Sequence, residues 1–411
     1  MVSSSPSHPA STNQKSNALV LSALQALGGT SPAIIVAVGG LAGQQLASRP
    51  ELSTVPISIY HLGLALGTIP AAFIMRRLGR RGGYLIGALL GIIGGLVASY
   101  GIHANLFTVL CLGTLLAGLY ASYVQSYRFA AADAATAQFR PKAISWVMAG
   151  GLLAAFIAAQ AVMLTRDLNP DAPYSAAFIA QASLGLMALP LILLLRLPRD
   201  HATQNTNARG RPLREIARSP YFVISVITGV VSYALMTLIM TAAPLAMHQY
   251  GHGLDDSTFG IQWHILAMYG PSFFTGHLIQ RFGKITIALT GILIIGSSSV
   301  VALTGTEVSH FWLALILLGL GWNFGFIGAT AMVTDCYRPE EKNQVQAVND
   351  FLVFGTVAAG SFSSGHLLAA SGWQQLNMMV FPIVICIACA LLWLRIQRRY
   401  GPQGAESSQA Q

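Results

Sequence analysis

The sequence predicts an all-α integral membrane protein with twelve transmembrane helices, arranged as two related six-helix halves. Hydrophobic residues make up 54% of the 411 residues and charged residues only 9%, against roughly 25% charged in an average soluble domain. The apolar residues form runs of about 20, the length at which a helix crosses a bilayer. A basic motif that follows the second run recurs after the eighth, which indicates an internal duplication.

The first six apolar runs predict the helices of an N-terminal half, residues 18–195. Backbone groups inside lipid have no water to bond to, so each run is expected to be helical. The polar residues 1–17, rich in Ser and Pro, lack the charge order of a signal peptide and are interpreted as a cytoplasmic tail. The six runs cover residues 18–47, 55–75, 83–102, 106–132, 143–165 and 175–195.

The other six runs predict a C-terminal half, residues 221–396. The polar and basic stretch 196–220 is interpreted as a cytoplasmic linker between the halves, and residues 397–411 as a second cytoplasmic tail. The six runs cover residues 221–248, 259–279, 285–303, 311–334, 345–370 and 376–396.

The distribution of Lys and Arg predicts the orientation in the membrane. These residues gather in loops on one side of the predicted helices, and the other side has only Arg49 and Arg166. Cytoplasmic loops are the ones enriched in Lys and Arg. We therefore expect a multi-pass protein of the cell (inner) membrane, with both termini in the cytoplasm and the loop of Asp255 and Asp256 outside.

The two halves carry a sequence repeat. Residues 77–80, Arg-Leu-Gly-Arg, follow the second run, and residues 281–284, Arg-Phe-Gly-Lys, follow the eighth, 204 residues later. A similar offset relates Asp133 to Asp335, at the ends of the fourth and tenth runs. Two duplicated halves explain both offsets.

At these motifs the chain resembles the major facilitator superfamily. The signature of that superfamily is a glycine, three residues and then Asp-Arg-x-Gly-Arg-Arg. Residues 72–81 and 276–284 match its glycine and basic positions in part, whereas Arg76 and Gln280 replace its acid and Ala72 replaces the first glycine of one copy. The resemblance implies a fold of two six-helix halves.

Several ionisable residues near the cytoplasmic ends are candidates for a gate or for coupling. Ionisable side chains in membrane helices tend to be functional. Asp350 is expected either to relay a proton or to brace the gate against an arginine. The candidates are Arg77, Arg81, Arg128, Arg281 and Asp350.

The residues also argue against other function classes. The formal net charge of +9 comes from short loops rather than one continuous face, which argues against nucleic acid as a partner. The chain has no phosphate-binding Gly-rich loop with Lys, no nucleophile elbow and no His-Glu-x-x-His pair. We therefore expect a secondary transporter and not an enzyme, with the lipid bilayer around it.

The seventh and eighth runs carry candidate metal ligands. Met236 and Met240 are four residues apart, as are His264 and Met268, so each pair lies on one helix face. The seventh helix runs outward and the eighth inward, and at about 1.5 Å per residue Met240 lies near the depth of His264. Thioethers and imidazole without a carboxylate favour monovalent copper. Methionine is also a common filler of apolar cores.

These four residues resemble the hallmark of the CcoA-type copper importers within the superfamily. The hallmark is Met-x-x-x-Met on the seventh helix and His-x-x-x-Met on the eighth, which Met236, Met240, His264 and Met268 match. The resemblance implies import of copper by alternating access, for assembly of a cbb3-type cytochrome oxidase. Copper would be the transported substrate, with no permanently bound cofactor and with a cytoplasmic copper acceptor as partner.

An outer capture site is a further expectation. Met247, His248 and His252 lie near the outer end of the seventh helix, above the deeper ligands. Loop histidines are usually only solvated, so the two interpretations stay open here.

Three alternatives to copper import remain open from the sequence. In an importer of riboflavin or another aromatic solute, Trp263, Trp322 and Tyr233 would stack on the substrate and His264 would bond to it. In a proton-coupled drug exporter, the metal ligands would be incidental. A membrane-embedded sensor or assembly partner would bind copper without moving it.

Overall fold

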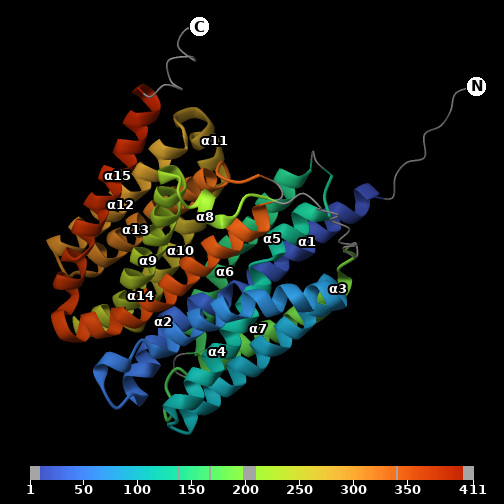
Figure 1. Cartoon of the computed structure of the whole chain (residues 1–411). Coiled ribbons are helices and arrows are strands. Elements are labelled where there is room, and N and C mark those ends of the chain that lie inside the picture. Colours follow the sequence, from blue (N-terminus) through green and yellow to red (C-terminus); the bar gives the residue numbers. More distant parts are fainter. Residues whose placement is uncertain (1–9, 137–138, 166–167, 198–209, 339–340, 401–411) are drawn as a thin grey trace, which may run out of the picture. The chain divides into compact units, whose positions relative to one another are not determined.

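The computed structural model describes residues 10–136, 139–165, 168–197, 210–338 and 341–400, and its regular structure there is entirely helical (Figure 1). The chain divides into two compact units. One unit contains residues 1–34 and 63–202, and the other contains residues 35–62 and 203–411.

The first unit is a helical bundle with a tyrosine-rich core. Tyr84 and Tyr127 are fully buried, and their rings meet edge to face with centroids 4.8 Å apart. Tyr120 and Tyr123 lie in the same core. The helices of this unit are α1 (Ala10–Gly28), the larger part of α3 (Val55–His103), α4 (Phe107–Val124), α5 (Tyr127–Asp133), α6 (Arg140–Thr165) and α7 (Ser175–Leu194).

The second unit is built around α13, which packs against α9, α10 and α12. The Ser58 hydroxyl lies 3.3 Å from that of Ser361 and so connects the beginning of α3 to α14. The elements of this unit are most of α2 (Thr30–Leu46), η1 (Pro50–Leu52), the beginning of α3, α8 (Leu213–Ile216), α9 (Pro220–Gln249), α10 (Leu254–Tyr269), α11 (Ser272–Phe282), α12 (Lys284–Thr304), α13 (Val308–Val333), α14 (Lys342–Met378) and α15 (Val380–Tyr400).

The described helices account for the twelve predicted crossings. Nine helical segments within the described residues are long and apolar enough to cross a membrane. Two of them, Pro50–His103 and Gln344–Arg398, have 54 and 55 residues, about twice the length that one crossing needs. Gly79 and Gly372 interrupt these two segments with non-helical backbone angles. The shorter α10 and α11 together make one more crossing.

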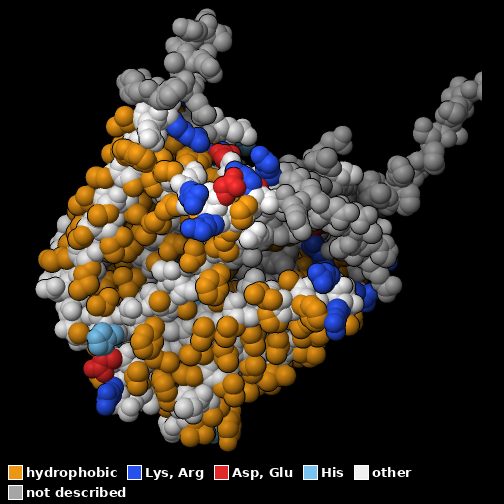
Figure 2. Space-filling view, viewed as in Figure 1, with side chains coloured by type: hydrophobic (Ala, Val, Ile, Leu, Met, Phe, Trp, Pro, Cys, Tyr) orange, Lys and Arg blue, Asp and Glu red, His pale blue; other side chains and the backbone are white. Residues whose placement is uncertain are grey.

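The outward faces of the helices are apolar, as in a protein that lies in lipid. Figure 2 shows hydrophobic side chains over the sides of the helices and Lys and Arg near their ends. Ile69, Leu164 and Phe351 are 78%, 73% and 74% exposed. Because lipid replaces water as the solvent, such exposure has no hydrophobic cost in a membrane.

The sequence repeat corresponds to a repeated structure. Gly79 has φ 75° and ψ 161°, and Gly283 has φ 86° and ψ 151°, a conformation in which a Cβ would be strained. Directly after each glycine a cation forms an ion pair of 2.5 Å. Arg80 binds Asp133, and Lys284 binds Asp335. The prediction of two duplicated halves is thus confirmed.

Three predicted helices differ in detail. The first begins at Ala10, inside the predicted tail, and stops at Gly28 before α2. The fourth is divided into α4 and α5. The eighth breaks between Tyr269 and Ser272, because Pro271 has no N–H to continue the helix ladder. The predicted C-terminal tail and residues 1–9 lie largely outside the described residues.

Candidate functional site

The four predicted metal ligands are all buried. Met236 is 1% exposed, Met240 8%, Met268 6% and His264 0%. The first two lie on α9 and the last two on α10. The burial of three methionines and a histidine is compatible either with a metal site or with apolar packing between helices.

His264 is fixed against α13. Its Nδ1 lies 2.7 Å from the carbonyl oxygen of Leu315, and since a carbonyl only accepts, Nδ1 carries the proton. A Cβ at Gly319 would overlap the carbonyl of His264, so the glycine allows the two helices to approach closely. The Nε2 atom of His264 is buried and has no hydrogen-bond partner.

The depths of the residues on α9 follow from contacts with α13. A Cβ added at Gly325 would lie 2.5 Å from the Ser232 hydroxyl, and Gly229 lies beside Ala329, so α9 and α13 are antiparallel. Met240 lies about two turns beyond Ser232, toward the Val308 end of α13. This places Met240 at about the depth of His264.

An aromatic cluster lies beside these residues, formed by Tyr233, Tyr269, Trp322, Phe326 and Phe354. Tyr233 meets Trp322 edge to face with ring centroids 5.3 Å apart, and Trp322 is stacked on Phe326 at 5.2 Å and 14°. Tyr233 also contacts Phe354, and Tyr269 contacts Trp322 at 6.4 Å. Four helices, α9, α10, α13 and α14, therefore contribute aromatic faces to one region.

Polar atoms without partners accompany the aromatic cluster on α9, α10 and α13. Buried polar atoms are normally hydrogen-bonded, so several unpaired ones on neighbouring helices indicate a place for a polar substrate group. They are Thr237 Oγ1, Thr241 Oγ1, Gln262 Oε1, His264 Nε2 and Trp322 Nε1.

The predicted outer capture residues have three different environments. Met247 is fully buried, and His248 is exposed. The Nε2 atom of His252 lies 2.7 Å from the carbonyl oxygen of Thr306. Among the residues that the structure describes, no three His, Cys, Asp or Glu side chains are grouped so that they could hold a metal ion.

The predicted gate residues lie at exposed positions. The guanidinium groups of Arg77, Arg128 and Arg281 lie over the rings of their neighbours Phe73, Phe129 and Phe282, at 4.2, 4.8 and 5.3 Å. Arg81 is exposed. Asp350 is also exposed and accepts a hydrogen bond of 3.2 Å from Asn349. Two ion pairs at these helix ends join Arg80 to Asp133 and Lys284 to Asp335.

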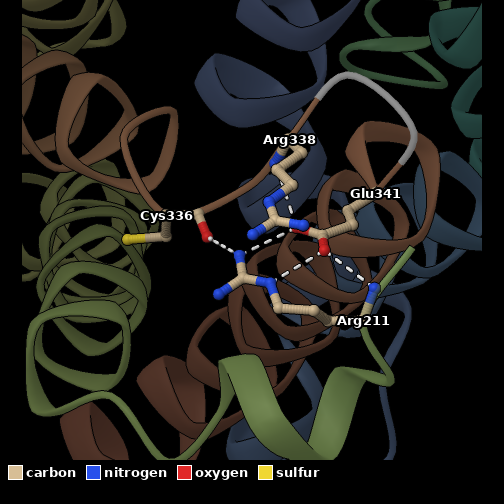
Figure 3. Close-up of polar contacts among 4 residues, drawn as sticks. All are labelled: Arg211, Cys336, Arg338 and Glu341. Atoms are coloured by element: carbon tan, nitrogen blue, oxygen red, sulfur yellow. Dashed lines mark hydrogen bonds and ion pairs between the residues drawn. The ribbon is translucent and has the colours of Figure 1, made fainter.

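A second polar cluster fixes the linker to the loop before α14 (Figure 3). Arg211 donates from its backbone N and from Nε to one carboxylate oxygen of Glu341, at 2.8 and 2.9 Å, and from Nη2 to the other. It also donates to the carbonyl of Cys336, and Arg338 N donates to Glu341. The Glu341 side chain is 1% exposed. Its hydrogen bonds with Arg211 lower its pKa to about 2.

Comparison with known families decides the class of protein. The sequence matches the Major Facilitator Superfamily over residues 18–349 and 266–411. The chain belongs to this superfamily. As a member it is a multi-pass membrane protein, and membership supports a transporter rather than an enzyme.

Solved structures agree with the superfamily fold. The chain has a TM-score of 0.70 with a crystal structure of the nucleoside transporter NupG, 14% identical, covering 92% of this chain and 99% of that one. It has the same score with the xylose transporter XylE from E. coli in a partially occluded inward open conformation, also 14% identical, covering 95% and 98%.

A relative within the superfamily contradicts the predicted copper import. The chain is 55% identical over 395 residues to the riboflavin transporter RfnT of Brucella anthropi, covering 96% of this chain and 98% of the relative. The superfamily prediction is therefore confirmed, and the assignment to the copper importers is wrong. The spacing of Met236, Met240, His264 and Met268 misled because the same buried, uncharged residues also suit the wall of an aromatic substrate site.

Sequence reasoning missed Tyr269 and Asn323. Tyr269 follows Met268 directly and joins the aromatic cluster through Trp322. Asn323 is fully buried on α13, and its side chain bonds to residues on both sides of the helix break. The available signal was an amide in the middle of a long apolar run, since an amide in lipid needs a specific partner.

Proposed function

We propose that this chain is a secondary transporter that imports riboflavin by alternating access. The observation that carries the proposal is the 55% identity to the riboflavin transporter RfnT across nearly the whole of both chains. Identity of this extent makes a shared substrate the most economical assumption for members of one superfamily.

The aromatic cluster supports an aromatic substrate. Riboflavin contains a flat three-ring system, and aromatic side chains bind such rings face to face or edge to face. The Tyr233 ring lies at right angles to the rings of Trp322 and Phe326, with centroids 5.3 and 5.2 Å away. The rings of Trp322 and Phe326 are nearly parallel, with centroids 5.2 Å apart. The predicted stacking residue Trp263 is 46% exposed instead, so it has no part in the proposal.

The polar atoms without partners support recognition of the edge of the ring system. That edge carries carbonyl oxygens and ring nitrogens, which accept and donate hydrogen bonds. Trp322 Nε1 can only donate, and His264 Nε2 accepts when Nδ1 holds the proton. The site is therefore complementary to an uncharged substrate with both kinds of polar group.

The proposal orients the protein with its basic helix ends and both termini in the cytoplasm. This orientation rests on the enrichment of Lys and Arg at the helix ends that carry Arg80 and Lys284. Riboflavin would then enter from the side of the loop that contains Asp255 and Asp256. In this proposal the substrate and the surrounding lipid are the only partners needed.

Uptake of radioactive riboflavin tests the proposal. A bacterial strain that cannot make riboflavin and has no importer of its own would express the wild type, Trp322→Ala or Trp263→Ala at equal membrane levels. We expect uptake and growth at low riboflavin with the wild type and Trp263→Ala, and a loss of uptake with Trp322→Ala. Absence of uptake by the wild type would contradict the proposal, and equal losses in both variants would contradict the assignment of the site.

A further inference from the structure

Asn323 is an amide buried completely in the middle of α13. A polar side chain in a membrane helix is costly unless its polar atoms find partners inside the protein. Both polar atoms of Asn323 have them. Nδ2 lies 2.6 Å from the carbonyl oxygen of Met268 and 2.7 Å from the Ser272 hydroxyl, and Oδ1 accepts from the Thr275 hydroxyl at 2.6 Å.

These partners lie on the two sides of the break between α10 and α11. Pro271 has no N–H, so the carbonyl of Ala267, four residues earlier, loses its helical donor. In a continuous helix the carbonyl of Met268 would accept from the backbone of Ser272. Here it accepts from Asn323, and the Thr275 hydroxyl also lies 2.8 Å from the carbonyl of Pro271. One side chain therefore bonds to the end of α10 and to the first turn of α11.

The break adjoins the candidate site. α10 contains His264 and ends at Tyr269. On α13, Trp322 directly precedes Asn323. The rings of Tyr269 and Trp322 are 6.4 Å apart. A change in the direction of α10 at the break would therefore move Tyr269 and His264 relative to Trp322.

We infer that Asn323 is a positioning residue for the substrate, because it fixes the end of α10 and so holds Tyr269 and His264 in place against Trp322. The inference deepens the proposed function and rests on it for the identity of the substrate. Asn323 acts through these residues, and no contact between Asn323 and the substrate is required. Loss of its hydrogen bonds should therefore weaken substrate affinity more than it slows the transport cycle.

Two matched variants separate hydrogen bonding from side-chain volume. Asn323→Leu keeps the shape of the side chain and removes all its hydrogen bonds. Asn323→Asp keeps the shape, and burial in an apolar setting holds the introduced carboxyl in its neutral form, which can still donate to Met268 and accept from Thr275. We expect Asn323→Leu to raise the KM for riboflavin uptake about tenfold with little change in Vmax, and Asn323→Asp to restore most of the affinity.

Hydrogen exchange of the purified full-length chain provides a readout that needs no substrate. Asn323→Leu should speed amide exchange in the peptide that covers residues 265–276, and Asn323→Asp should speed it much less. Unchanged exchange in Asn323→Leu would overturn the inference, and so would a fall in Vmax at constant KM. If the wild type failed to transport riboflavin while exchange responded as expected, the proposed substrate would be wrong and the role of Asn323 at the break would stand.

A less disruptive variant tests the inference if Asn323→Leu does not fold. If Asn323→Leu does not accumulate in the membrane, Thr275→Val removes one of its hydrogen bonds and keeps the buried volume. We expect Thr275→Val to raise KM and exchange in the same direction by smaller factors. Wild-type values for both would overturn the inference.

Discussion

His264 on α10 donates a hydrogen bond of 2.7 Å from Nδ1 to the carbonyl of Leu315 on α13, and this bond leaves Nε2 buried and unpaired. The two ring nitrogens thus have different environments. Nδ1 joins two helices, and Nε2 is the atom that we propose binds the substrate. A variant that separates the two nitrogens tests whether both matter.

His264→Asn is this variant, because the amide nitrogen of asparagine occupies about the position of Nδ1 and nothing replaces Nε2. We expect it to unfold at nearly the wild-type temperature in detergent and to bind riboflavin about tenfold more weakly, since a hydrogen bond to a buried group is lost. His264→Ala should lose both stability and affinity. Riboflavin binding by His264→Asn at the wild-type level would show that Nε2 has no role in recognition.

The same variants distinguish copper from riboflavin as the substrate of the site around His264. Copper accumulation in cells should be equal for the wild type, His264→Asn and vector alone, because the relative at 55% identity is a riboflavin transporter. Accumulation above vector that His264→Asn abolishes would show that the chain transports copper through a site that contains His264.

The close approach of α10 and α13 predicts a strong effect of Gly319→Ala. The new Cβ would overlap the carbonyl oxygen of His264 and lie 3.1 Å from the backbone nitrogen of Met268, so the helices would have to separate. Such overpacking typically costs about 1–3 kcal/mol. We expect a lower unfolding temperature and a loss of riboflavin uptake.

Gly276→Ala is the matched control for Gly319→Ala. Gly276 lies on α11, and a Cβ there would meet no atom within 4 Å. Its replacement should leave both uptake and unfolding temperature unchanged. If both glycine variants behaved alike, the contact with His264 would not explain the effect of Gly319→Ala.

Most of the fold could be predicted because hydrophobicity, periodicity and Lys and Arg are local features of the sequence. The repeat at Gly79 and Gly283 was visible as a spacing, and the structure shows the same backbone angles at both. The ion pairs at the helix ends were not predicted. Arg77 and Arg281, at equivalent places in the repeat, remain predicted gate residues, and the structure shows that Arg80 and Lys284 bind Asp133 and Asp335.

The site was harder to predict because it depends on which helix faces meet. Met240 and His264 lie at about the same depth and are both buried, but spacing alone does not decide between a metal and an aromatic substrate. Tyr233, Trp322 and Tyr269 come from three helices, and their convergence is a tertiary feature. The bond from Asn323 across the helix break depends equally on the packing of α13 against α10.

The ion pair between Lys284 and Asp335 predicts that the two charges can be exchanged between these positions with little loss of stability. Lys284 and Asp335 have side chains 33% and 38% exposed, and pairs of this kind contribute about 0.2–1 kcal/mol. Lys284→Asp should lower the unfolding temperature slightly through repulsion of Asp335. Combining it with Asp335→Lys should restore much of the loss. The effect should shrink at high salt, and a double variant no more stable than the single one would contradict a pairwise interaction.

The contact between Arg211 and Glu341 predicts an attachment of the linker that tolerates mild acid. The pKa of Glu341 in the folded chain, about 2, is lower than the usual value of 4.5 because Arg211 and the backbone donate to its carboxylate. A carboxyl group with a lowered pKa contributes its full stabilisation above the unfolded pKa and loses it as the pH falls toward the folded value. From pH 7 to about pH 4.5 the attachment should therefore not weaken through this group.

Glu341→Gln tests the attachment at neutral pH, because it imitates the protonated carboxyl in shape and charge. A neutral amide removes the charge-assisted bonds to Arg211, and we expect trypsin to cut after Arg211 and Arg214 severalfold faster than in the wild type. Glu215→Gln is the matched control, since Glu215 is exposed on α8, in the same linker. Equal cutting rates in Glu341→Gln and the wild type would mean that other contacts hold the linker, such as the hydrogen bond of 3.1 Å from Arg211 to the carbonyl of Cys336.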